Sequence, residues 1–135
     1  MICSKCPFKE RAVAHTTGPR DADIAVVSRS PGHYEALNGK SFSGPSGKVL
    51  DHLLQLHGRD RETVLATNVV LCQADGQETG FGLAIECCRP RLEAEIKDCK
   101  TVIACGAEAT RMLLDTGVGG VSSIFAVFGQ KNRTL

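Results

Sequence analysis

The cysteines are the residues of this chain whose type and spacing best suit chemistry. Cys3 and Cys6 form a C-x-x-C pair that can place two thiolates on one metal from a single turn. Cys88 and Cys105, on an expected helix and an expected strand, could supply two more ligands, and four thiolates suit either zinc or an iron-sulfur cluster. The competing interpretation is that Cys88, Cys99 and Cys105 lie on apolar faces as small core residues.

The remaining cysteines give weaker signals. Cys72, Cys87 and Cys99 are interpreted as non-ligands, although spacing does not distinguish Cys87 from its neighbour Cys88. The total of seven is odd, and a disulfide framework is not expected in a reducing compartment. Metal or cluster ligation is therefore the leading use for several of them.

A second candidate for chemistry is Gly39-Lys40-Ser41, which is similar to the end of a phosphate-binding loop. Such a loop needs four residues between its first glycine and the Gly-Lys-Ser, but six residues separate Gly32 from Gly39. The spacing argues against a nucleoside triphosphatase and leaves open what the stretch from 30 to 48 surrounds.

Length and composition indicate one soluble domain, residues 1–135. The net charge of +1 provides no general basic field, so any nucleic-acid contact must be local. The sequence contains no signal-like start and no apolar run approaching the ~20 residues that span a bilayer. We therefore expect a cytoplasmic protein that does not contact a membrane.

Apolar runs and helical periodicities alternate along the chain. The pattern predicts strands at 24–27, 63–70 and 101–105, helices at 46–57, 83–99 and 107–114, and a possible strand at 124–128. Such alternation is typical of an α/β fold, a three-layer α/β/α sandwich with a mostly parallel sheet of about four strands. Because ligands bind beyond the carboxyl ends of such strands, the loop after Val27, Asn68 and Gly106 should share one edge.

Several stretches in one order resemble the family 4 uracil-DNA glycosylases, the iron-sulfur branch of that superfamily. The matching pieces are Cys3-x-x-Cys6, then "GPRDADIAVVSRSPGHYEALNGKSFSGPSGKVLD", "ETVLATNVVLC" and "CRPRLEAEIKDCKTVIACGAEA", which contains Cys88 and Cys105. The resemblance implies a structural [4Fe-4S] cluster held by Cys3, Cys6, Cys88 and Cys105. It also implies DNA as the partner. Replication or repair proteins are expected as further partners if the chain is a non-catalytic member.

The resemblance also implies roles for the loop and the second strand. Phe42 would stack on a flipped uracil, and Asn68 would read the edge of the base with its amide, which offers both a donor and an acceptor. Lys40 and the stretch containing Gly44, Ser46 and Gly47 would approach the DNA backbone. Taken singly, the same residues suit a loop anchor, a strand-end cap and ordinary turn chemistry.

The chain departs from the family pattern at two places. Arg29 occupies a position where the family has an acidic residue, and an arginine can bind phosphate but cannot orient water or stabilise a sugar cation. Glu35 is a weak geometric substitute. The terminal His-Pro-Ser motif of the family has no counterpart, because His15, His33, His52 and His57 all lie too early.

These departures leave three functions open. The first is a uracil-DNA glycosylase-like protein that binds DNA and hydrolyses the N-glycosidic bond of a flipped uracil. The second is a catalytically impaired member that serves as an iron-sulfur DNA-binding or protein-binding module. The third is a small zinc protein unrelated to DNA, which would leave the ordered matches unexplained.

Overall fold

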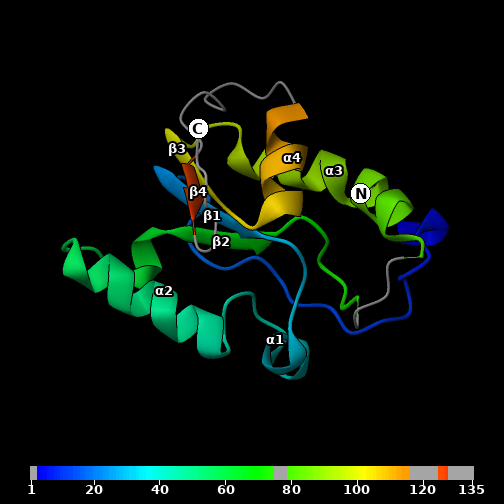
Figure 1. The fold of residues 1–135 in the computed structure, drawn as a ribbon, viewed down its shortest axis with the longest axis horizontal. Coiled ribbons are helices and arrows are strands. Elements are labelled where there is room, and N and C mark those ends of the chain that lie inside the picture. The colour runs from blue at the N-terminus through cyan, green and yellow to red at the C-terminus, as the bar shows by residue number, and fades with distance from the viewer. Residues whose placement is uncertain (1–2, 75–78, 116–124, 128–135) are drawn as a thin grey trace.

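A computed structural model describes residues 3–74, 79–115 and 125–127 of the chain (Figure 1). Its strands are β1 (Ile24–Ser28), β2 (Leu65–Asn68), β3 (Thr101–Cys105) and β4 (Phe125–Val127). They form one sheet in the order β2-β1-β3-β4, and every neighbouring pair is parallel. The predicted α/β class with a parallel sheet is confirmed. Apart from β4, the tail after residue 115 lies outside the described residues.

Within the described part of the chain, four α-helices accompany the sheet: α1 (His33–Asn38), α2 (Pro45–Leu56), α3 (Phe81–Ile96) and α4 (Ala107–Asp115). Helix α2 lies on one side of the sheet, and α3 and α4 lie on the other (Figure 1). Three of the five β1 residues, Ala25, Val26 and Val27, are fully buried, as expected for a parallel strand covered on both faces.

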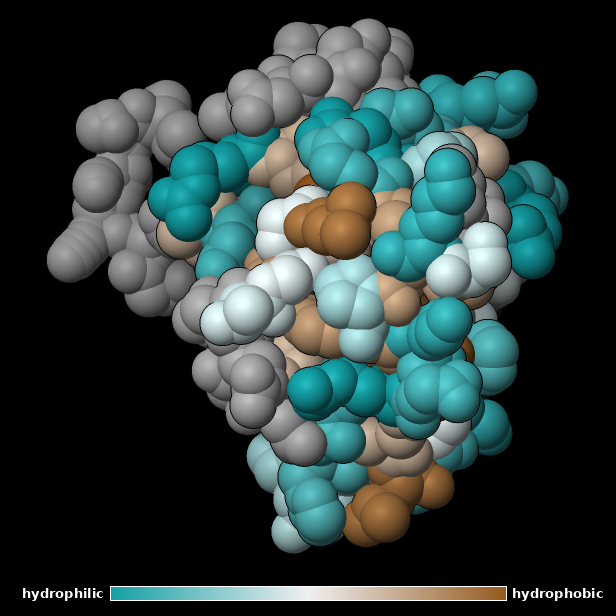
Figure 2. Space-filling view, turned by 90° about the vertical axis from the view of Figure 1, so that its right-hand side faces the viewer, coloured by the Kyte–Doolittle hydropathy of each residue, from teal (hydrophilic) through white to brown (hydrophobic). Residues whose placement is uncertain are grey.

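Two hydrophobic clusters correspond to these two sides. Ala25 and Val27 of β1 pack with α3 and α4, whereas Val26 packs with Leu50 and Leu54 of α2. Because side chains alternate along a strand, neighbouring residues of β1 stabilise opposite layers. One face of the molecule, shown in Figure 2, carries mainly hydrophilic and intermediate side chains with isolated hydrophobic ones.

The helix boundaries differ from the predicted ones at the start of α2. The helix predicted over residues 46–57 has Gly44 as its N-cap and Pro45 as its first helical residue. Proline is favoured there because its missing N–H would have no partner in the helix. The carboxylate of Glu35 accepts a hydrogen bond from the Gly44 amide at 2.9 Å, which serves in place of a side-chain cap. The short helix α1, which supplies Glu35, was not predicted.

Among the described residues, no helix combines the length and the apolar character needed to cross a membrane.

Candidate functional site

The carboxyl ends of β1 and β2 form a pocket with the loop that precedes α2. Its volume is about 150 Å³, and it is lined by Ser28, Ser30, Gly32, Glu35, Phe42, Ser46 and Asn68. We call this the strand-end pocket. Ser28 and Asn68 are opposite one another in the β1–β2 register. The predicted edge of the sheet is therefore where the pocket lies, and Phe42 and Asn68 are brought together there.

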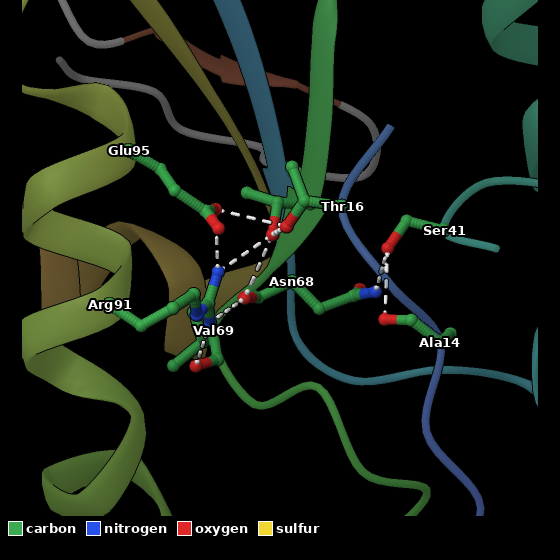
Figure 3. A network of polar contacts seen from close by, with 8 residues as sticks. Ala14, Thr16, Ser41, Asn68, Val69, Arg91 and Glu95 are labelled. Atoms are coloured by element: carbon green, nitrogen blue, oxygen red, sulfur yellow. Dashed lines mark hydrogen bonds and ion pairs between the residues drawn. The ribbon is translucent and has the colours of Figure 1, made fainter. Parts of the chain in front are cut away.

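Asn68 is almost completely buried, and its side chain points toward the loop. Its amide nitrogen donates to the Ser41 hydroxyl at 3.2 Å, and that hydroxyl donates to the carbonyl of Ala14 at 3.5 Å (Figure 3). The side-chain amide belongs to a lining residue of the pocket and retains an oxygen that can accept. Such a group can recognise a ligand that presents an N–H next to a carbonyl.

Phe42 has a backbone conformation that is rare for a residue with a side chain. Its φ is 55°, in the left-handed region, where a non-glycine residue costs about 1–3 kcal/mol. The guanidinium of Arg61 compensates by donating to the carbonyls of Ser41 and Phe42, and it also pairs with Asp51 at 2.7 Å. Arg61 therefore holds the loop in the shape that aims Phe42 into the pocket.

Replacement of Arg61 with methionine is expected to lower the free energy of unfolding by about 2 kcal/mol, because several hydrogen bonds to a charged group are lost. Urea titration measures this change. Arg59→Met is the matched control, since Arg59 is exposed and two residues away, and it should change stability by less than about 0.5 kcal/mol. Equal effects of the two substitutions would show that Arg61 does not support the loop.

Glu35 is the carboxylate of the strand-end pocket, although sequence analysis treated it as only a weak substitute for the missing acidic residue. It is 9% exposed, and one of its oxygens is engaged by the Gly44 amide. The other oxygen lies against Gly32, where a Cβ atom would be 2.8 Å away. The glycine thus leaves room for a carboxylate at the wall of the pocket.

Arg29 is not among the lining residues of the strand-end pocket. Its guanidinium lies 3.9 Å from the centre of the Phe81 ring of α3 and pairs with Glu108 of α4 at 3.1 Å. The guanidinium also donates to the hydroxyl of Ser30, a lining residue of the pocket, at 3.3 Å. Arg29 therefore connects α3 and α4 with the wall of the pocket and provides no carboxylate there. Lys40 is exposed on the loop and remains a candidate for phosphate contact.

The other residues predicted to contact a DNA backbone differ in exposure. Ser46 is exposed in the first turn of α2, whereas Gly44 and Gly47 are buried. A Cβ atom at Gly47 would lie 1.8 Å from the carbonyl oxygen of Phe42. Gly47 therefore has a packing role, which is to let α2 approach the Phe42 loop.

A larger cavity of about 330 Å³ adjoins the pocket through shared residues, including Ser28 and Phe42, and is lined by Cys105 and Gly106. Burial raises the pKa of the Cys105 thiol to about 12. Cys105 thus behaves as a neutral, apolar wall residue near neutral pH.

We expect Cys105 to react slowly with iodoacetamide at pH 8, about 1,000-fold more slowly than a thiol of ordinary pKa, because little thiolate is present. Between pH 9 and 12 the folded protein holds this proton while the unfolded chain has lost it, so this thiol makes stability fall as pH rises. Mass spectrometry of the Cys105 peptide, compared with glutathione in the same tube, measures the rate. Labelling as fast as that of glutathione would contradict the assignment.

Five cysteines surround a different cavity, on the opposite side of the sheet from Cys105. This cysteine cavity has a volume of about 180 Å³ and is lined by Cys3, Cys6, Lys9, Val13, His15, Leu71, Cys72, Cys87 and Cys88. Cys3, Cys6 and Cys88 are therefore brought together as predicted. Cys105 is not with them, because it packs in the α2 cluster, and Cys72, which was interpreted as a non-ligand, takes its place.

The donor chemistry of the cysteine cavity suits a thiolate-bound group. All seven cysteines of the chain are free. Burial raises the pKa of the Cys6 thiol, and the backbone amide of Phe8, which donates to the Cys6 sulfur at 3.4 Å, acts in the opposite direction. Burial, with smaller contributions from the Cys88, Cys6 and Cys3 sulfurs, raises the pKa of Cys72 to about 11. A cationic centre in the cavity would offset that cost of bringing thiolates together.

The described residues include no group of three or more histidine, cysteine or acidic side chains arranged to hold a single metal ion. The thiols surround a cavity instead. The sequence did contain a signal that Cys72 lies near the other ligands. It follows Asn68, the last residue of β2, by four residues, and it precedes Cys88 by sixteen, so it lies in the segment that connects β2 to α3.

Comparison with known proteins agrees with this geometry. A profile of the Uracil DNA glycosylase superfamily matches residues 15–133, which is most of the chain. The chain therefore belongs to the uracil-DNA glycosylase superfamily.

Within the superfamily the chain is similar to proteins named type-4 uracil-DNA glycosylase. The one from Sulfurisphaera tokodaii is 30% identical over 136 residues, which cover 96% of this chain and 61% of that protein. Those from Saccharolobus solfataricus and Archaeoglobus fulgidus are 32% and 31% identical and cover 82% and 78% of this chain. The chain spans between 54% and 61% of the length of these relatives.

Proposed function

We propose that this protein binds DNA and excises uracil from it, with the flipped base in the strand-end pocket. The observation that carries the proposal is the meeting of Phe42, Asn68 and Glu35 around one pocket in a chain of this superfamily. An aromatic ring, an amide and a carboxylate are the groups needed to stack a base, to read its edge and to stabilise a sugar cation.

Each residue in or near the pocket has a separate role in binding the DNA and the base. Phe42 packs against the face of the base, and the amide of Asn68 exchanges hydrogen bonds with the N–H and carbonyl of the uracil edge. Lys40 and the exposed start of α2 at Ser46 contact the phosphates. Water then attacks the anomeric carbon as the bond to uracil breaks. The base leaves as an anion, and the proton that the attacking water releases neutralises it.

Glu35 provides the negative charge on the sugar side of this reaction. Positive charge develops on the sugar as the glycosidic bond breaks, and a fixed carboxylate stabilises that charge because it is already held in place by the Gly44 amide. Arg29 has no part in this step, since its guanidinium pairs with Glu108.

A [4Fe-4S] cluster bound in the cysteine cavity is the cofactor we propose. Cys3, Cys6 and Cys72 would hold it together with Cys88 or Cys87, and all five sulfurs line that cavity. When bound, the cluster supplies structural cross-linking of the N-terminal segment, the end of β2 and α3. Five thiols around one cavity, and the similarity to proteins named type-4 uracil-DNA glycosylase, support this proposal.

The second function, a binding module without catalysis, is favoured by one observation. The position expected to be acidic carries Arg29, whose guanidinium pairs with Glu108 and lies over the Phe81 ring. Replication and repair proteins would then be the partners, with DNA held in the same place.

Release of uracil from single-stranded and double-stranded oligonucleotides tests excision. We expect release by the natural protein, at least about 100-fold less from Asn68→Ala, and a comparable loss in Glu35→Gln, whose amide oxygen can still accept from Gly44. Release by all three proteins at one rate would exclude the pocket as the site. No release, with DNA binding retained, would establish the binding module instead.

A further inference from the structure

A buried ion pair joins helix α3 to the end of strand β2, next to the pocket (Figure 3). Arg91 and Glu95 lie 2.9 Å apart, and each side chain is only 9% exposed. One terminal nitrogen of Arg91 also donates to the Thr67 hydroxyl at 2.8 Å. The other donates to the carbonyls of Asn68 at 2.7 Å and Val69 at 3.0 Å. A single planar guanidinium therefore holds the last two peptide carbonyls at the point where the chain leaves the sheet.

Glu95 fixes the orientation of this guanidinium. Its carboxylate accepts from Arg91 and, at 2.9 Å, from the hydroxyl of Thr16, which lies 2.7 Å from the Thr67 hydroxyl. Buried ion pairs of this kind are often replaceable by apolar residues without loss of stability. We therefore assign the Arg91–Glu95 pair a role in positioning the end of β2 rather than in raising the free energy of unfolding.

The contacts define what is positioned. The amide of Val69 donates to the carbonyl of Ser28, the last residue of β1, at 2.8 Å, and the amide of Val70 donates to the carbonyl of the next residue, Arg29, at 3.1 Å. The end of β1 thus holds the N–H groups that follow Asn68, while Arg91 holds the carbonyls. Because both the N–H groups and the carbonyls at this point of the backbone are held, the direction of the Cα–Cβ bond of Asn68 is fixed. The side chain runs away from Arg91 and reaches Ser41, the residue before the pocket-lining Phe42.

We propose that Arg91, oriented by Glu95, is a positioning residue that sets the Asn68 amide for recognition of the base. The assignment of a base as the ligand of Asn68 rests on the proposed function. The hydrogen bonds from Arg91 to the carbonyls at the end of β2 do not depend on that function. Arg91 touches neither the base nor the sugar, so its effect passes through Asn68.

The test uses the double variant Arg91→Met, Glu95→Gln, which leaves no unpaired charge buried. The control is Arg89→Met, Glu86→Gln, which removes an ion pair of the same 2.9 Å length from the exposed side of α3. Two readouts are needed. Hydrogen exchange of the peptide covering residues 65–71 reports the strand end. The affinity ratio for oligonucleotides with 2′-fluoro-2′-deoxyuridine or 2′-fluoro-2′-deoxycytidine reports recognition of the base edge, because the fluorine slows hydrolysis.

We expect the Arg91 double variant to exchange the Val69 and Val70 amides at least about 10-fold faster, while β1 and β3 keep their protection. The preference for uracil over cytosine should fall to that of Asn68→Ala, with the affinity for the cytosine oligonucleotide unchanged. Arg91→Lys should restore part of the preference, since an ammonium can donate to one carbonyl but cannot reproduce the planar fork. The control variant should match the natural protein in both readouts.

Unchanged exchange, or faster exchange with an unchanged preference, would overturn the proposal. Faster exchange throughout the sheet would also overturn it, because Arg91 would then support the whole fold. Equal affinity of the natural protein for the uracil and cytosine oligonucleotides would contradict the proposed function. The exchange result would still decide whether Arg91 holds the strand end.

Discussion

Cys72→Ser is expected to abolish retention of iron, whereas Cys105→Ser leaves the iron content unchanged. Cys72 lines the cysteine cavity with Cys3, Cys6, Cys87 and Cys88, and a serine oxygen is a poor ligand for a cluster held by thiolates. The natural protein should carry about four iron atoms per chain and absorb broadly in the blue region. Anaerobic purification, an iron assay and an absorbance spectrum measure the difference.

Cys105→Ser is a demanding control because the sequence predicted Cys105 as a cluster ligand and Cys72 as a non-ligand. In the structure Cys72 lines the cysteine cavity and Cys105 does not. Cys105 lies in the α2 cluster and lines the cavity next to Phe42. Loss of iron from Cys105→Ser with retention in Cys72→Ser would restore the original ligand set. A colourless natural protein containing one zinc per chain would reject the cluster altogether.

Gly47→Ala is expected to lower the free energy of unfolding by about 3 kcal/mol and to weaken DNA binding. The added methyl group would be 1.8 Å from the Phe42 carbonyl oxygen, a backbone atom that cannot rotate away. That carbonyl is also an acceptor for Arg61, so moving it disturbs the contact that supports the strained Phe42 conformation. Urea titration and fluorescence anisotropy with a labelled oligonucleotide measure the two effects.

Gly82→Ala provides the matched control for this substitution. Gly82 lies in α3, is exposed, and a Cβ atom there would have nothing within 4 Å. Alanine should therefore stabilise the helix by about 0.5–1 kcal/mol, the ordinary preference over glycine. A similar gain in stability from Gly47→Ala would mean that α2 does not press against the Phe42 loop.

The sequence predicted the layers and the edge of the sheet that carries the pocket because those follow from local periodicity. It paired Cys88 with Cys105 because spacing alone does not tell which face of the sheet a side chain meets. Cys105, at the end of β3, packs on the α2 side, whereas Cys88 packs on the α3 side, so the sheet separates them. Cys72 lies beyond β2, where the chain has turned toward the N-terminal segment.

The supporting arginines were beyond prediction for a different reason. Arg61 contacts Phe42 across nineteen residues, and Arg91 contacts Asn68 across twenty-three. Contacts of this kind depend on the packing of α2 and α3 on the sheet, and no local pattern records them. The i,i+4 spacing of Arg91 and Glu95 is typical of an ordinary surface ion pair, and only their burial distinguishes this pair from one.

The affinity of the natural protein for single-stranded oligonucleotides with one 2′-fluoro-2′-deoxyuridine or one 2′-fluoro-2′-deoxycytidine tests recognition of uracil in the strand-end pocket most directly. The two bases present opposite donor and acceptor patterns to an amide, so a pocket that reads the edge through Asn68 must separate them. At a fixed salt concentration we predict at least about 10-fold tighter binding of the uracil oligonucleotide, falling below about twofold in Asn68→Ala. Equal affinities in the natural protein, or a preference that survives Asn68→Ala, would contradict the account.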